Sequence, residues 1–391
     1  MFSITDIQSQ RSNPVGKGRQ FIDADGHVIE PDDIWENYLE PAFRSEMPFT
    51  RFKYQGNPLT CTEEIRVAGD VLPASGVAGF PTPVAKDAEY EEAARQGFPP
   101  HVYIEAMDRV GIDYMVVYPS VGLLLWSAPH LKAAAGAAYC RAYNNWVRDF
   151  CVETHGRVVG AGCLDLRDVD AAIKEARRCV KELGMKALRI QPIPVDRRPL
   201  FDRSYDPLWA TVADLNVPLG IHPGAPSYET LIADYMSGTD PGVVSAQVTT
   251  AFSVGSMLAS AALIMGGVLQ RHPMLRVVHL ECGAGWVPFW MDRLAVSVQG
   301  GNRGMDVPGL PMYPADYFRR QCYISADPDD PGIKSVIDSL GDDNIVVATD
   351  FGHPEGHRYL RAIDDLVKLP GVSADSKRKI MWDNARKLYQ L

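Results

Sequence analysis

Residues 20–27 read QFIDADGH, a short apolar run that ends in acidic side chains and a histidine. Similar β-branched runs recur along the chain, with longer stretches of helical periodicity between them. Strands that alternate with helices in this way indicate βα units around a parallel sheet. We predict eight strands, at residues 20–25, 114–118, 158–163, 186–190, 217–221, 276–280, 321–325 and 345–349. Eight is the number that closes a (β/α)8 TIM barrel, so the predicted fold class is α/β with this architecture.

The stretches between the predicted strands carry helix signals of their own. Residues 169–183 place apolar side chains on one helical face and stop before Gly184, a residue typical of helix ends. Asp206 and Pro207 together form a typical helix start. Residues 374–389 have the periodicity of a final amphipathic helix.

Two segments are too long for ordinary βα loops. Residues 31–100, rich in proline and glycine, separate the first two predicted strands. Within a single domain over residues 1–391, we expect them to form an insertion that caps the barrel mouth and contributes to its pocket. A packing or oligomer arm is the alternative. Residues 223–250, after the fifth strand, are a second candidate for such a segment.

Composition and charge exclude several classes of protein. The 391 residues are 46% hydrophobic, which argues against extended disorder. The formal net charge of −10 is opposite to that of a non-specific nucleic-acid binder. Residues 241–270 carry no formal charge, but their serines, threonines and glycines argue against a membrane span. Seven scattered cysteines without a CxxC pair, and a polar start without a signal-peptide core, favour a reducing, cytoplasmic setting.

Polar side chains end four of the predicted strands, at the edge where such barrels carry their active sites. They are Asp25 and His27 on the first strand, His222 on the fifth, His279 and Glu281 on the sixth, and Asp350 on the eighth. Because alternate strand residues share a face, Asp25 and His27 should point the same way, as should His279 and Glu281. Taken singly, such residues are usually helix caps or hydrogen-bonded core histidines. Burying several together is costly unless they are paired or bind a cation, and these ligand types suit zinc, manganese or iron.

Six segments are informative in their order and spacing. They read FIDADGHVIEP (21–31), PLGIHPGA (218–225), GGVLQRHPMLRVVHLECGAGWVPFWMDRL (266–294), FRRQCYIS (318–325), IVVATDFGHPEG (345–356) and KIMWDNARKLYQL (379–391), and the stretch at 266–286 and the segment around Asp350 are the most distinctive. On these segments the chain resembles the amidohydrolase superfamily. The resemblance lies in the branch that includes aminocarboxymuconate-semialdehyde decarboxylase and the aromatic-acid decarboxylases of the resorcylate and carboxyvanillate type.

The resemblance implies a metal-dependent hydrolase type of barrel with four metal ligands, Asp25, His27, His222 and Asp350. The bridging lysine of two-metal relatives has no clear counterpart, so we expect one divalent ion. Zinc is the first choice, with manganese or iron as alternatives. In relatives the strand-8 aspartate also handles protons, which makes Asp350 a catalytic acid/base. One of His279 and Glu281 replaces a family histidine on strand 6, so both are further catalytic candidates.

Four more residues are candidate substrate contacts, each with a structural alternative. Arg189 could clamp a carboxylate with its planar fork, or form an ion pair at the barrel rim. Glu30 could touch substrate or cap a loop, and Trp286 could line a pocket or pack in the core. His353 could touch substrate, although a hydrogen bond that holds Asp350 is the preferred role.

The acid that precedes His27 resembles the aromatic-acid decarboxylases and favours non-oxidative decarboxylation of an aromatic or unsaturated carboxylic acid. Hydrolysis of an amide, ester or carbon–carbon bond by metal-activated water is the runner-up. A non-catalytic barrel that binds a small molecule is the third possibility, because fold alone does not decide function. We expect a small-molecule carboxylic acid as partner, no nucleic acid or membrane, and a homodimer or larger homo-oligomer by analogy with relatives.

Overall fold

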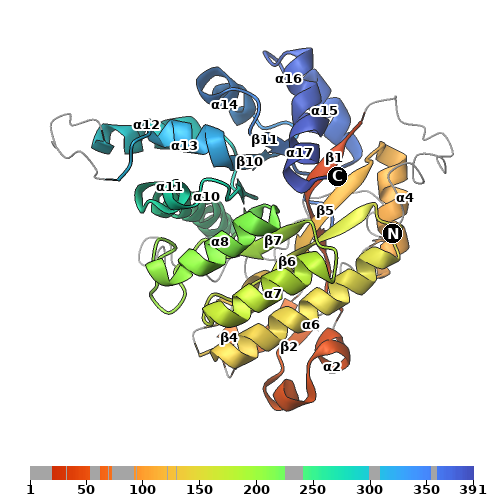
Figure 1. Cartoon of the computed structure of the whole chain (residues 1–391). Helices are drawn as coiled ribbons and strands as arrows, with labels where there is room; N and C mark the ends of the chain where they lie inside the picture. The colour runs from red at the N-terminus through yellow and green to blue at the C-terminus, as the bar shows by residue number, and fades with distance from the viewer. Residues whose placement is uncertain are drawn as a thin grey trace.

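The computed structural model describes residues 20–31, 33–52, 62–68, 70–72, 92–93, 95–120, 122–128, 130–224, 241–298, 309–353 and 359–391. Eight strands form one parallel sheet in the order β1-β5-β6-β7-β8-β9-β10-β11 (Figure 1). They are β1 Ile22–Val28, β5 Tyr114–Pro119, β6 Val158–Cys163, β7 Ala187–Ile190, β8 Leu219–Ile221, β9 Val277–His279, β10 Cys322–Ala326 and β11 Ile345–Val347. Every predicted strand overlaps one of these, so the predicted (β/α)8 barrel is confirmed.

The barrel closes at a seam between its first strand, β1, and its last, β11. The backbone N–H of Asp350 donates to the carbonyl of Asp25 at 3.0 Å. The N–H of His27 donates to the carbonyl of Phe351 at 2.7 Å. The seam is therefore fastened by the same short segments that carry the predicted metal ligands.

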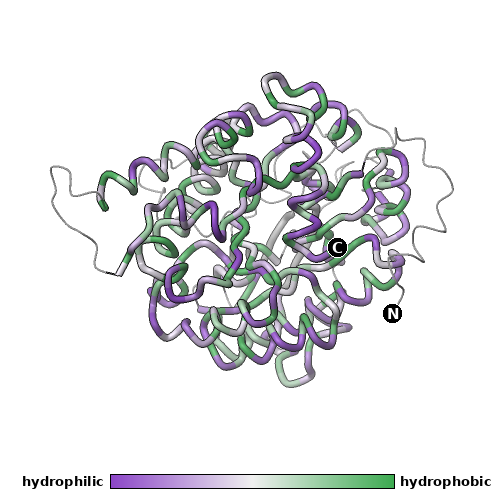
Figure 2. Tube along the Cα trace, turned by 45° about the horizontal axis from the view of Figure 1, so that its top comes forward, coloured by the Kyte–Doolittle hydropathy of each residue, from purple (hydrophilic) through white to green (hydrophobic). Residues whose placement is uncertain are grey.

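Helices surround the strands (Figure 1). They are α4 Pro100–Val110, α5 Gly122–Leu125, α6 Ala133–Val152, α7 Val169–Lys181, α8 Asp206–Leu215, α10 Pro241–Met265, α11 Val268–Arg271, α12 Trp286–Val298, α13 Pro314–Gln321, α14 Gly332–Leu340 and α15 Ala362–Lys368. Along many of them hydrophobic and hydrophilic residues alternate in Figure 2, as one buried face requires. The predicted helix 169–183 is α7, which Asp168 caps by accepting from the N–H of Ala171 at 2.9 Å.

The C-terminal helix closes one end of the barrel. It runs as α16 Ala374–Arg378, a π-helical turn Lys379–Asp383 and α17 Asn384–Tyr389, which matches the predicted 374–389 helix. Leu388 and Tyr389 of α17 pack with barrel residues such as Tyr118 and Val278 in one buried apolar cluster. Apolar side chains thus fill this end, and the polar groups gather at the carboxyl ends of the strands.

The described residues between 33 and 72 of the predicted insertion 31–100 contact helix α6. They comprise α2 Ile34–Tyr38, a 3-10 helix Pro41–Glu46, and an antiparallel sheet of β2 Phe49–Phe52, β3 Thr62–Val67 and β4 Asp70–Leu72. Arg141 pairs with Glu40 at 2.6 Å, and Lys132 pairs with Glu46 at 2.9 Å. These contacts favour the packing role for the described parts. Residues 73–91 lie outside the described residues, so the capping role stays a prediction.

The second long segment, 223–250, is helical in its last ten residues. Helix α10 already begins at Pro241, and residues 225–240 lie outside the described residues. Among the helices that the structure describes, none combines the length and hydropathy needed to cross a bilayer. Six cysteines fall within the described residues, and all six are free thiols.

One expected result concerns the hydroxyl of Tyr389. It lies 3.2 Å from the carbonyl of Ala24 and 3.3 Å from the hydroxyl of Tyr118, all in the buried barrel interior. Tyr389→Phe should lower the free energy of unfolding by about 1–2 kcal/mol, because it leaves the Tyr118 hydroxyl without this partner. Urea unfolding measures the loss. Adding Tyr118→Phe should restore part of it, and a double variant as unstable as the sum of both would contradict this pairing.

Candidate metal centre

A β-bulge in β1 turns Asp25 toward the barrel mouth. The pairing of β1 with β5 shifts by one residue between Asp23 and Gly26. Ile22 and Ala24 before the shift belong to the interior cluster, whereas Gly26 after it faces Met115 on the outside. The extra residue is accommodated at Asp25, which lets this side chain share a face with His27. Strict alternation would have placed Asp23 on that face as well.

Both histidines of the predicted ligand set are fixed through Nδ1. The Nδ1 of His27 lies 3.0 Å from the carbonyl of Pro119, and the Nδ1 of His222 lies 2.8 Å from the carbonyl of Pro223. A carbonyl oxygen only accepts, so Nδ1 must carry the proton and Nε2 of the neutral ring keeps its lone pair. This is the arrangement in which a histidine binds a metal through Nε2.

The chain turns sharply after β11 and brings Asp350 to His27. Asp350 has φ of +58° and Gly352 has φ of +108°, both in the left-handed region. A Cβ at Gly352 would lie 2.4 Å from the carbonyl oxygen of His27, so only glycine allows this approach. As a result, Asp350 Oδ1 lies 3.1 Å from Nε2 of His27 and 3.0 Å from Nδ1 of His353.

Glu281 joins the same group, but His279 does not. Glu281 Oε2 lies 3.6 Å from Nε2 of His222. The prediction that both side chains point the same way is wrong, because β9 ends at His279 and Glu281 has φ of +47°, which breaks the alternation. His279 instead points outward and packs against Trp286 and Phe318, with ring centroids 5.6 and 6.4 Å away.

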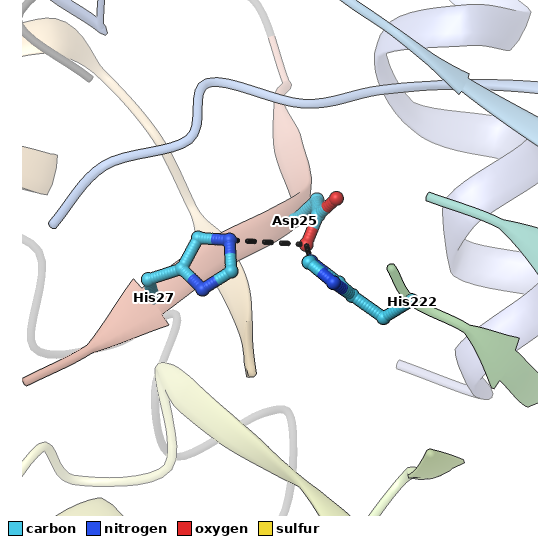
Figure 3. Close-up of side chains that lie close together, drawn as sticks. All are labelled: Asp25, His27 and His222. Atoms are coloured by element: carbon cyan, nitrogen blue, oxygen red, sulfur yellow. Dashed lines mark ion pairs between the residues drawn. The ribbon is translucent and has the colours of Figure 1, made fainter. Parts of the chain in front are cut away.

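Four buried ligand atoms converge at the mouth of the barrel. Figure 3 shows Asp25 between His27 and His222, with its Oδ1 3.8 Å from Nε2 of His27 and 3.5 Å from Nε2 of His222. These three atoms and Oδ1 of Asp350 have no partner of good hydrogen-bond geometry among the described residues. Buried polar atoms are rarely left so, and each would cost about 1–3 kcal/mol. A cation at their centre would satisfy all four, so the donor set fits a divalent metal.

The electrostatics of the group also fit a bound cation. Burial, helped by the charge of neighbouring Asp350, raises the pKa of Asp25 to about 7 against the lowering effect of His27. Burial lowers the pKa of His222 well below its ordinary value, which keeps the ring neutral and its lone pair available. Burial opposes ionisation of Asp350, but His353 and His27 outweigh it and hold the pKa of that carboxyl below its usual range.

Arg189 and Glu30, two of the remaining predicted contacts, support the backbone around this group. Arg189 is buried, donates to the carbonyl of His222 at 3.0 Å, and lies 5.8 Å from the ring centre of Trp126. Glu30 accepts from the N–H groups of Ser120 at 3.2 Å and Gly122 at 2.9 Å, as in its capping alternative. Roles for Arg189, Glu30 and Trp286 in substrate binding stay predictions.

Sequence reasoning missed two buried residues that organise the site. The Asp23 carboxylate, with its pKa raised to about 7 by burial, accepts from both the N–H and the hydroxyl of Thr349 and so locks the seam. The hydroxyl of Ser120 lies 2.9 Å from Nε2 of His353. Their places near the ends of β1 and β5 were the available signal in the sequence. That signal is weak, because a lone serine or an outward aspartate has no distinctive spacing.

The different surroundings of Glu281 and His279 predict different outcomes when each is replaced. Glu281→Gln should weaken divalent-metal binding, because it removes a carboxylate beside His222. His279→Phe should leave metal affinity unchanged, since burial lowers the pKa of this histidine to about 3 and its ring packs among aromatics. Metal titration and thermal unfolding of both variants test this. Lost metal affinity in His279→Phe with an intact fold would contradict the assignment.

Solved structures with the same fold include two of clear similarity. An amidohydrolase from Mycobacterium avium subsp. paratuberculosis superposes with a TM-score of 0.77 at 23% identity and covers 96% of this chain and 99% of its own. The 5-carboxyvanillate decarboxylase from Novosphingobium aromaticivorans, complexed with manganese and 4-hydroxy-3-methoxy-5-nitrobenzoic acid, gives 0.68 at 19% identity, with coverages of 96% and 97%. At these identities the likeness supports the fold.

Curated proteins with similar sequences include two decarboxylases. A gamma-resorcylate decarboxylase from Polaromonas sp. is 26% identical over 307 residues, which are 74% of this chain and 86% of the relative. A 2-amino-3-carboxymuconate-6-semialdehyde decarboxylase from Dictyostelium discoideum is 26% identical over 290 residues, which are 73% and 75%. The pattern of the family described as Amidohydrolase matches residues 22–391. With the strand order and the site at the strand ends, this match identifies the chain as a member of the amidohydrolase family.

Proposed function

We propose that this protein is a metal-dependent, non-oxidative decarboxylase of an aromatic or unsaturated carboxylic acid. The observation that carries the proposal is the convergence of Asp25, His27, His222 and Asp350 through buried atoms that lack hydrogen bonds. Similarity to decarboxylases of gamma-resorcylate and of 2-amino-3-carboxymuconate-6-semialdehyde supports this reaction class. Hydrolysis stays the alternative, because the same ligands serve metal-activated water.

We propose one divalent ion, held by these four residues with Glu281 alongside. Zinc was the first choice from the sequence, and imidazole suits it. Carboxylates from Asp25, Asp350 and Glu281 make the donor set rich in oxygen, which also suits manganese. When bound, the ion supplies positive charge that holds the oxygen anions of a substrate and stabilises charge that develops on them.

Asp350 is the residue that we propose to move the proton. Its pKa is held below the usual range by His353 and His27, so the carboxylate is ionised at neutral pH and first acts as a base. It can accept the proton of a substrate phenol and then return it to the ring carbon that carries the carboxylate. As that carbon–hydrogen bond forms, the bond to the carboxylate breaks, its electron pair stays with the ring, and CO2 leaves.

The test is a substrate panel on protein loaded with zinc or manganese. Hydroxybenzoates, including 2,6-dihydroxybenzoate, and muconate-like acids are incubated in D2O, and released CO2 and deuterium at the vacated carbon are measured. CO2 release with one deuterium per product is the expected result. Turnover of amides or esters alone would replace the decarboxylase with the hydrolase, and a chain that holds no divalent ion would favour a binding role.

We also propose a homodimer or larger assembly in a reducing cytoplasm, with small carboxylic acids as the partners. Exposed apolar side chains on neighbouring helices, Leu258 of α10 with Phe289 and Val296 of α12, support an association surface. Sedimentation measures the assembly. A monomer at micromolar concentration would contradict it.

A further inference from the structure

A chain of three buried side chains leads away from the proposed metal centre. Ser120 directly follows β5, and its Oγ lies 2.9 Å from Nε2 of His353. Nδ1 of the same ring lies 3.0 Å from Oδ1 of Asp350. Ser120, His353 and Asp350 have exposed fractions of 1%, 4% and 8%, so little water competes for these contacts.

The donors and acceptors of this chain fix the state of the His353 ring. Nδ1 of His353 lies 3.0 Å from Oδ1 of Asp350, and an ionised carboxylate oxygen only accepts, so a proton on Nδ1 is the arrangement that avoids contact between two lone pairs. In the neutral ring Nε2 then keeps its lone pair, and the Ser120 hydroxyl donates to it. His353, Asp350 and His27 also form a second group with metal-ligand spacing. A proton on Nδ1 removes His353 from that ligand set.

Ser120 is itself held in place from the other side. The carboxylate of Glu30 accepts from its backbone N–H at 3.2 Å, which anchors the start of the loop after β5. The ring of His353 stacks on that of His27, with centroids 3.6 Å apart and planes 16° apart. The chain thus reaches two of the proposed ligands, Asp350 by the close contact of Nδ1 with Oδ1 and His27 by stacking.

We infer that Ser120 is a positioning residue of the metal centre, which acts through His353 to hold Asp350 in the place where it binds the metal. The inference rests on the proposed function only in assuming that a divalent ion binds there. Groups that orient ligands in this way typically change metal affinity by about 10–100-fold when removed.

The experiment is a double-mutant cycle with the Mn²⁺ dissociation constant as its readout, measured by competition with a fluorescent chelator. Ser120→Ala should weaken binding by about 10-fold. His353→Asn keeps a donor near Nδ1 but has nothing for the hydroxyl to bind, so adding Ser120→Ala to it should have no further effect. Ser260→Ala is the matched control, because this buried hydroxyl donates within α10 to the carbonyl of Met257 at 2.8 Å. Equal effects of Ser120→Ala in both backgrounds would overturn the inference.

A second readout needs no metal. In metal-free protein, ¹⁵N spectra of the histidine rings should assign the proton of His353 to Nδ1, with the His353→Asn spectrum identifying its signals. A proton on Nε2 would overturn the inference by making His353 a metal ligand. Neither readout uses turnover. If Ser120 and His353 are coupled in Mn²⁺ affinity but no CO2 is released, only the proposed reaction is overturned. A wild-type chain that binds no Mn²⁺ would overturn both.

Discussion

His222→Ala should abolish turnover and divalent-metal binding while leaving the barrel folded. Its Nε2 lies 3.5 Å from Oδ1 of Asp25 and 3.6 Å from Oε2 of Glu281. The imidazole therefore lies between two of the carboxylates around the proposed ion. Removing a direct ligand should cost more than the roughly 100-fold at the upper end of what a supporting residue costs. Asp350→Asn should behave alike, because it removes both a ligand charge and the proposed acid/base.

Metal content after dialysis, and CO2 release, measure these losses. His272→Ala is a suitable control, because His272 pairs with Asp206 at 3.1 Å on the helical layer, between α8 and α11. It should keep full metal content and activity. Near-normal turnover in either His222→Ala or Asp350→Asn, with the control unaffected, would remove the basis for the proposed centre.

Gly352→Ala should disturb both the seam of the barrel and the proposed metal centre. The residue has φ of +108°, and the added carbon would meet the carbonyl oxygen of His27 at 2.4 Å. Either the turn after β11 or strand β1 must move, and both carry proposed ligands. We expect lost metal affinity and a loss of more than about 3 kcal/mol in the free energy of unfolding. This is more than the roughly 1–2 kcal/mol that left-handed backbone strain alone costs, because the steric clash with strand β1 adds to it.

Gly184→Ala separates backbone strain from the steric clash. Gly184 has a comparable left-handed φ of +74°, but a Cβ there would meet no atom of the described residues within 4 Å. Urea unfolding and Mn²⁺ titration of the two variants should therefore give a small loss of stability and unchanged metal binding for Gly184→Ala. Equal behaviour of both variants would contradict the close contact between Gly352 and β1.

Much of the barrel could be predicted from the sequence, because its strands are short apolar runs and its helices carry regular periodicity and caps. Side-chain direction was predictable only where the backbone stays regular. Asp25 and His27 share a face as expected. A bulge that the sequence does not signal turns Asp23 to the opposite face of β1. The left-handed turn at Glu281 separated it from His279. Ser120 could not be found, because its partner lies 233 residues away.

The seam of the barrel has a consequence for how the centre is assembled. Asp25 and His27 come from the first strand, and Asp350 follows the last one. During synthesis Asp25 and His27 are made early, and the last of the four proposed ligands, Asp350, follows only when almost the whole polypeptide has left the ribosome. A fragment that lacks either end of the chain cannot supply all four ligands, and an ion bound between β1 and the turn after β11 would resist separation of these two strands.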